Sequence, residues 1–100
     1  MTEFTSVGRS ATGRASRYGS QLVKHFTAKD VEGSWEDTRG FVRFSFGLAE
    51  FEAADDALIM RVACTSEEDV ARLRDVVERH LVRFGTRDEL SVTWDSGSEN

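Results

Sequence analysis

The spacing of apolar residues changes along this chain, and the change restricts the fold more than any other feature of the sequence. Over residues 66–84 apolar residues recur at intervals of three and four, which places them on one face of a helix. They are Val70, Leu73, Val77, Leu81 and Phe84. Over residues 41–64 the interval falls to two, as in strands with one buried and one solvated face. Such segments can bury their apolar faces only by packing helices against a sheet.

The helix predicted at residues 66–84 has signals at both ends. Thr65 and Glu68 have the spacing of a capping box, which would satisfy backbone N–H groups at the helix start. Gly85 is expected to end the helix, because glycine readily adopts the left-handed conformation found after many helices.

A second helix is predicted from Ala15 to Ala28, where Tyr18, Leu22 and Phe26 are four residues apart. Gly19 lies inside it and costs about 1 kcal/mol of helix stability relative to alanine. This helix is therefore expected to depend on packing against the sheet.

Period-two alternation and turn residues predict the strands. They cover residues 4–9, 31–36, 41–46, 48–53, 58–64 and 90–94, with turns at Gly47 and at Asp55-Asp56. The expected fold is α+β: a two-layer sandwich of one mostly antiparallel sheet with two helices on one face, in the order strand, helix, four strands, helix, strand. We expect a single domain over residues 1–100, with frayed ends at residues 1–2 and 96–100.

Charge and cysteine content restrict the partners and the compartment. The net charge of -5 opposes binding to nucleic acid and to anionic membrane surfaces. Cys64 is the single cysteine and cannot form an internal disulfide, and the chain has no long apolar run at its start. These features predict a cytoplasmic protein that binds neither nucleic acid nor membrane.

Several short runs give the chain a family resemblance. They are Ser16-Arg17-Tyr18, Lys24-His25-Phe26, Gly40-Phe41-Val42-Arg43-Phe44 with Gly47, and His80-Leu81-Val82-Arg83-Phe84 followed by Leu90-Ser91-Val92-Thr93-Trp94. Over nearly its whole length the chain resembles the bacterial domain-of-unknown-function family 2218. The resemblance implies a small bacterial protein with no established activity, and it supplies no catalytic residue. Because this domain is also found attached to siderophore-interacting flavin reductases, the resemblance implies a loose association with siderophore and iron handling.

Arginines near the start of the first helix form one candidate site. Arg9, Arg14 and Arg17 are expected around a helix N-terminus, where backbone N–H groups and the helix dipole already favour negative charge. Tyr18 adds a hydroxyl donor. The cluster predicts a site for a small anion such as a carboxylate, a phosphate or a catecholate. The alternative is that these arginines are solvated or paired with the surplus acidic residues.

His25 and His80 form a second candidate site. His80 is expected to point into the apolar face of its helix, and His25 is expected at the edge of the apolar face of the other helix. Both helices are expected on one side of the sheet, so the two imidazoles could approach each other. Two neutral imidazoles could ligate a transition metal or haem iron. Since two ligands leave a metal site incomplete, the alternative is a pair of structural histidines, and no cofactor is expected.

The outer sheet face is a third candidate, and it would contact another protein or a second copy of the chain. Phe41 and Ile59 are expected there beside Arg43 and Arg61, which gives a mixed surface with two apolar side chains. No arrangement of residues indicates catalysis, because Cys64 lies on the inward row of its strand and neither histidine has a recognisable nucleophile beside it. The sequence favours a non-catalytic accessory module that binds a small anionic ligand or a partner protein, with a metal- or haem-binding domain as the alternative.

Overall fold

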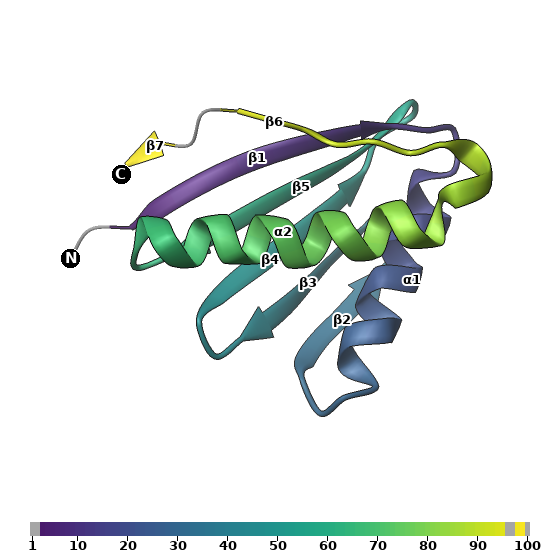
Figure 1. The fold of residues 1–100 in the computed structure, drawn as a ribbon. Helices are drawn as coiled ribbons and strands as arrows, with labels where there is room; N and C mark the ends of the chain where they lie inside the picture. Colours follow the sequence, from purple (N-terminus) through teal and green to yellow (C-terminus); the bar gives the residue numbers. More distant parts are fainter. Residues whose placement is uncertain (1–2, 96–97, 100) are drawn as a thin grey trace.

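A layer of antiparallel strands and a layer of two α-helices make up the computed structural model, which describes residues 3–95 and 98–99 (Figure 1). The strands are β1 (Phe4–Ala11), β2 (Glu32–Glu36), β3 (Arg39–Phe44), β4 (Gly47–Ala53), β5 (Ala57–Cys64), β6 (Thr93–Trp94) and β7 (Ser98–Glu99). The helices are α1 (Ala15–Thr27) and α2 (Glu67–Phe84), and a 3₁₀ helix, η1 (Thr86–Asp88), follows α2.

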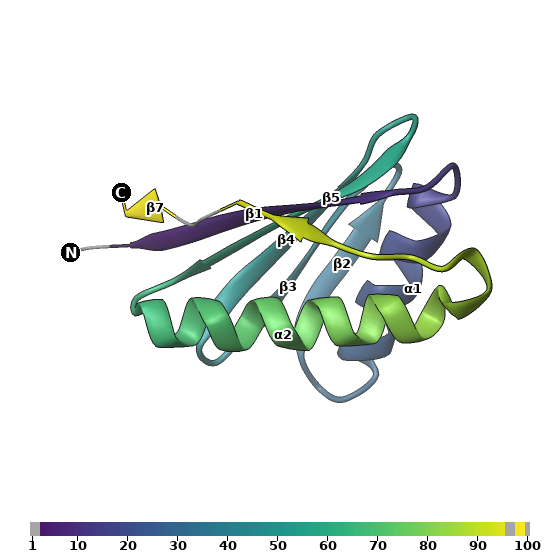
Figure 2. The same cartoon turned by 45° about the horizontal axis from the view of Figure 1, so that its top comes forward.

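The strands form one sheet in the order β2-β3-β4-β5-β1-β6, and β7 also pairs with β1. Every pairing is antiparallel. Both helices cover the same face: α1 packs against β2 to β5, and α2 packs against β4, β5 and β1 (Figure 2). The predicted α+β architecture and element order are therefore confirmed, and no helix of the described residues lies on the opposite face of the sheet.

The core lies between the sheet and the helices. It consists mainly of the apolar residues that recur every three or four positions in the helices and every two positions in the strands. The inward row of β5 and the apolar stripes of both helices are buried. They include Leu22, Val23 and Phe26 of α1, Leu58, Met60, Val62 and Cys64 of β5, and Leu73, Val77 and Leu81 of α2. Neither helix is both long enough and apolar enough to cross a bilayer, within the described part of the chain.

The residues that begin and end α2 do so by different contacts than the sequence predicts. Ser66, not Thr65, is the N-cap, because its backbone is extended and its Oγ accepts a hydrogen bond from the backbone N of Asp69 at 3.1 Å. Gly85 is not left-handed, since its φ is -98°. The glycine is required by packing: a Cβ at Gly85 would overlap the side chain of Leu90, which folds back over the end of the helix.

Several strand boundaries also differ from the prediction, and β3 covers Arg39–Phe44 instead of residues 41–46. The turn after β3 is formed by Ser45 and Phe46, and Gly47 begins β4, where a Cβ would overlap Cys64 Sγ. β1 continues to Ala11, and only Thr93–Trp94 of the predicted last strand pairs with β1. The predicted frayed residues 1–2, 96–97 and 100 lie outside the described residues, whereas Ser98–Glu99 pairs with β1.

Gly19 and Gly40 allow a tryptophan to lie between α1 and the sheet. A Cβ built on Gly19 would lie 2.5 Å from Trp35 Cη2, and one built on Gly40 would lie 2.5 Å from Trp35 Cε3. The Trp35 ring therefore needs glycine at both positions, and the glycine that weakens α1 as an isolated helix lets it pack closely against β2 and β3.

Candidate functional site

The start of α1 lacks the side chains that usually satisfy a helix N-terminus. Arg14 is the N-cap residue, its side chain makes no capping hydrogen bond with the described backbone, and the first turn contains no acidic residue. Thr12 Oγ1 accepts a hydrogen bond from the Arg14 backbone N at 3.0 Å, which fixes the turn just before the helix. The N–H groups of the first turn are therefore left to solvent or to a ligand.

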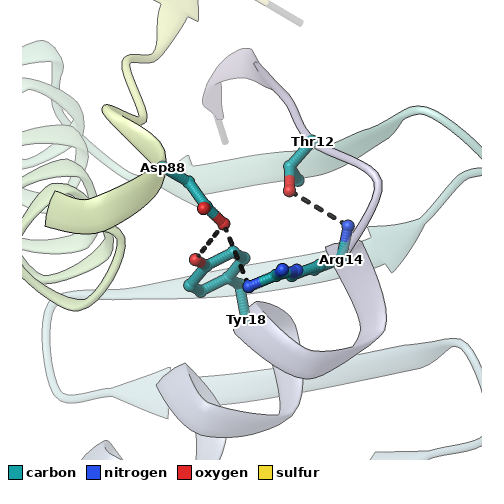
Figure 3. Close-up of polar contacts among 4 residues, drawn as sticks. All are labelled: Thr12, Arg14, Tyr18 and Asp88. Atoms are coloured by element: carbon teal, nitrogen blue, oxygen red, sulfur yellow. Dashed lines mark hydrogen bonds and ion pairs between the residues drawn. The ribbon is translucent and has the colours of Figure 1, made fainter.

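A carboxylate from the other end of the chain reaches this region. The Tyr18 hydroxyl donates a hydrogen bond of 2.5 Å to Asp88 Oδ2, and Arg14 Nη1 lies 3.7 Å from the same oxygen (Figure 3). The hydrogen bond to Asp88 raises the pKa of Tyr18, and burial raises it further. Sequence reasoning missed Asp88, because η1 is a short segment without a periodic pattern and lies far along the chain from α1.

The structure brings together only part of the predicted arginine cluster. Arg14 and Arg17 both lie at the start of α1, and both are exposed. Arg9 belongs to the outer face of β1, where it is the register partner of Ile59 and pairs with Asp56 at 3.3 Å. It is separated from the other two because β1 continues past it to Ala11.

A hollow of about 550 Å³ lies beside the first turn of α1. Its lining combines the first-turn backbone, two arginine side chains and the loops after β2 and β4. The lining residues are Gly13, Arg14, Ala15, Ser16, Arg17, Thr38, Ala53, Ala54 and Asp55. The chemistry of this hollow suits an anion, although Asp55 also lines it and adds one negative charge.

His25 and His80 lie side by side between the two helices. Their ring centroids are 4.9 Å apart, and the rings of Phe26 and Phe84 make edge contacts with His25 at 5.4 and 5.3 Å. His80 Nδ1 donates a hydrogen bond to the Val76 carbonyl oxygen at 2.7 Å, so a neutral His80 keeps its lone pair on Nε2.

The environment of His25 favours its neutral form. Burial lowers the pKa of His25, and electrostatic repulsion from His80, Lys29 and Arg83 lowers it further. His25 Nε2 is buried and has no hydrogen-bond partner within the described structure. Across residues 3–95 and 98–99, no three His, Cys, Asp or Glu side chains are grouped as metal ligands.

The predicted interaction residues Phe41, Arg43, Ile59 and Arg61 all lie on the outer sheet face. Their register partners across the strands are exposed or partly exposed, and neither Phe41 nor Ile59 belongs to the core. Arg43 Nε donates to Glu32 Oε1 at 3.0 Å, while Arg61 makes no ion pair with any described residue.

Cys64 faces the core. Burial raises the pKa of its thiol, and the acidic side chains of Asp69 and Glu3 raise it further, so the reactive thiolate is disfavoured. The expectation that Cys64 is a core residue is confirmed.

These features define a class of protein: a small α+β domain with two helices on one face of an antiparallel sheet, basic residues at the start of α1 and an uncovered outer sheet face. Residues 7–95 match the family described as "Uncharacterized protein conserved in bacteria (DUF2218)", and the chain belongs to this family. The resemblance noted from the short sequence runs is thereby confirmed.

A solved structure has the same fold. The NMR structure of PA4090 from Pseudomonas aeruginosa is similar to this chain with a TM-score of 0.78 and 30% sequence identity, over 93% of this chain and 96% of that chain. No curated protein sequence matches the chain.

Proposed function

We propose that this DUF2218 protein is a non-catalytic accessory module that binds a small anionic ligand at the start of α1, in a process connected with siderophore iron. The observation that carries the proposal is the hollow of about 550 Å³ between the uncapped first turn of α1 and the loops after β2 and β4. The connection with iron rests on the family resemblance alone, and it selects catecholates as one ligand class to test.

The contacts at the helix start support an anion as the ligand. Arg14 lies 3.7 Å from Asp88, which is beyond hydrogen-bond distance, so its guanidinium donors remain available to a second anion. Arg17 makes no ion pair within the described structure and lines the same hollow. An anion here would accept hydrogen bonds from both guanidinium groups and from first-turn amides, in the favourable field of the helix dipole.

NMR titration with inorganic phosphate, citrate and 2,3-dihydroxybenzoate tests this proposal. We expect at least one probe to bind saturably and to shift the amide signals of residues 13–17. Arg14→Ala or Arg17→Ala should weaken that binding about 10- to 100-fold, since a hydrogen bond to a charged group contributes about 1.5–3 kcal/mol.

Arg79→Ala is the matched control, because Arg79 is an exposed arginine on α2 that pairs with Asp75 at 3.8 Å and does not line the hollow. It should leave probe binding unchanged. The proposal is wrong if no probe shifts these amides, or if all three arginine variants weaken binding equally.

A metal- or haem-binding domain is the second candidate. The observation that favours it is the buried His25 Nε2, which has no hydrogen-bond partner within the described structure and lies on a ring 4.9 Å from that of His80. A neutral imidazole in this position could ligate a transition-metal ion whose other ligands are water molecules, or it could ligate the iron of a haem.

Metal analysis and haem titration of protein purified without a histidine tag separate the two candidates. The histidine candidate predicts stoichiometric metal, or a Soret shift on adding haem, and predicts that His25→Ala and His80→Ala each abolish it. The anion proposal predicts that neither histidine variant changes probe binding at α1. Metal-free protein with an unshifted Soret band would rule out the histidine candidate.

A further inference from the structure

The outer sheet face presents one row of side chains that runs across four neighbouring strands. Register pairing aligns Phe41 of β3 with Glu50 of β4, Glu50 with Arg61 of β5, and Arg61 with Val7 of β1. Because paired residues in a sheet point to the same face, these four side chains stand side by side. The row reads apolar, acidic, basic, apolar.

This row is complementary to itself. A two-fold axis that lies parallel to the strands, between β4 and β5 and above the sheet, places β5 of one copy opposite β4 of the other and β1 opposite β3. Arg61 then faces Glu50 of the second copy, and Val7 faces its Phe41. Each apolar side chain meets an apolar partner, and each charge meets the opposite charge.

The two central charges are available for such contacts. Glu50 and Arg61 are direct cross-strand neighbours and both are exposed, yet neither makes an ion pair with another described residue. The same axis brings Arg39 near Arg9 of the second copy, but Arg39 already pairs with Glu52 at 3.7 Å and Arg9 with Asp56 at 3.3 Å. These internal pairs limit the repulsion at the rim.

The charge of the whole face also favours a second copy as the occupant. Its strand residues include four arginines and four glutamates, so the face is neutral although the chain carries a net charge of -5. They are Arg9, Arg39, Arg43 and Arg61 with Glu32, Glu36, Glu50 and Glu52. A strongly acidic or strongly basic partner would find no surplus of the opposite charge here, whereas a second copy presents a matching mixed pattern.

The outer sheet face has exposed apolar side chains and an area suited to a small protein–protein interface. Val7 is 38% exposed, and Val7 and Ile59 line a hollow of about 350 Å³ together with Glu50 and Arg61. Five strands about 4.8 Å apart and about seven residues long, at about 3.3 Å per residue, present roughly 550 Å² in projection. This is smaller than the roughly 800 Å² per partner of a typical stable complex, so the association should be weak and reversible.

We propose that two copies of this protein form a symmetric dimer through the outer sheet faces, with Arg61 of each copy paired with Glu50 of the other. The proposal does not depend on anion binding, because the hollow beside α1 lies outside this face.

Sedimentation analysis from micromolar to millimolar protein tests the proposal with a charge exchange. Wild-type protein should show a concentration-dependent shift from monomer to dimer. Glu50→Arg alone and Arg61→Glu alone should each abolish the shift, because each places like charges opposite each other twice. An equimolar mixture of the two variants should restore it, because it recreates the attractive pairs in a heterodimer.

Two valines with the same exposure provide a matched control. Val7 and Val82 are each 38% exposed, but Val7 is on the outer face and Val82 is on α2. Val7→Asp should abolish dimerisation, and Val82→Asp should preserve it. If Val7→Asp fails to fold, dilution of wild-type protein followed by NMR gives the same information, since signals of Val7, Phe41 and Ile59 should move and that of Val82 should not.

Wild-type protein that remains monomeric at millimolar concentration would overturn the proposal. It is equally overturned if the mixture of charge variants stays monomeric, or if dilution shifts signals on α2 instead of the outer face.

Discussion

Replacing Gly19 with alanine should destabilise this protein, although the same change stabilises most helices. In α1 the change would gain about 1 kcal/mol, because glycine is a poor helix former. However, the added Cβ would lie 2.5 Å from two atoms of the Trp35 ring and 3.2 Å from Leu58 Cδ1. The sign of the effect depends on whether the ring can move.

The structure indicates that the Trp35 ring cannot move easily. Its Nε1 donates a hydrogen bond to the Asp37 carbonyl oxygen at 3.1 Å, and the ring also lies close to the backbone at Gly40. Overpacking at such a site costs about 1–3 kcal/mol. After the gain in helix propensity, Gly19→Ala should lower the free energy of unfolding by about 1 kcal/mol, or the melting temperature by about 4–8 °C.

A double-mutant cycle with urea unfolding measures this balance. In a Trp35→Leu background the clash with the ring is absent, so Gly19→Ala should raise the free energy of unfolding by about 1 kcal/mol. The reversal of sign is the diagnostic result. If Gly19→Ala stabilises the wild-type protein, or lowers stability equally in both backgrounds, the packing account of Gly19 is incorrect.

Three further predictions concern buried polar groups. Tyr18→Phe should lower the free energy of unfolding by about 1.5–3 kcal/mol, because it removes a hydrogen bond to the Asp88 carboxylate, and thermal unfolding would detect the loss. Burial lowers the pKa of His25, so as pH falls below about 6.5 this histidine is protonated in the unfolded chain before it is protonated in the folded protein. The free energy of unfolding should therefore decline with falling pH until His25 is also protonated in the folded protein. Urea unfolding of His25→Gln should show a smaller decline over the same pH range. Cys64 should react with Ellman's reagent slowly in native protein at pH 8 and rapidly in urea, since burial raises the pKa of its thiol; rapid reaction in the native protein would contradict its placement in the core.

Periodicity alone located both helices and their common face. The helix expected at residues 15–28 is Ala15–Thr27, and the one expected at residues 66–84 is Glu67–Phe84. Long amphipathic stripes can be read from sequence because a periodic set of apolar residues must be buried together. For the same reason His80, on the apolar face of α2, and His25, at the edge of the apolar face of α1, could be expected to lie near each other.

Features that depend on a few local contacts could not be read in this way. Thr65 and Ser66 are equally good capping residues in sequence, and the choice between them depends on where the chain leaves β5. Conformational preference alone gives no reason for glycine inside α1 at Gly19 and a different reason at Gly85, whereas in the structure the side chains of Trp35 and Leu90 leave no room for a Cβ at these positions.

In the candidate anion site, too, some features could be predicted from sequence patterns and others depended on tertiary contacts. The basic residues at the start of α1 were visible in the sequence, and Arg14 and Arg17 do line one hollow. The separation of Arg9 depended on the length of β1, and the role of Asp88 depended on how the segment after α2 folds back. Neither feature has a signal in local sequence.

The position of β1 between β5 and β6 has a consequence for synthesis of the protein. Phe4 pairs with Cys64, and Gly8 pairs with Trp94, so β1 is completed on both sides by segments that are translated much later. Until β5 emerges, the nascent chain can form the hairpins among β2, β3 and β4, but β1 has no strand to join. We therefore expect β1 to stay unpaired and exposed to chaperones until β5 is translated, and its other edge to stay open until β6 is translated.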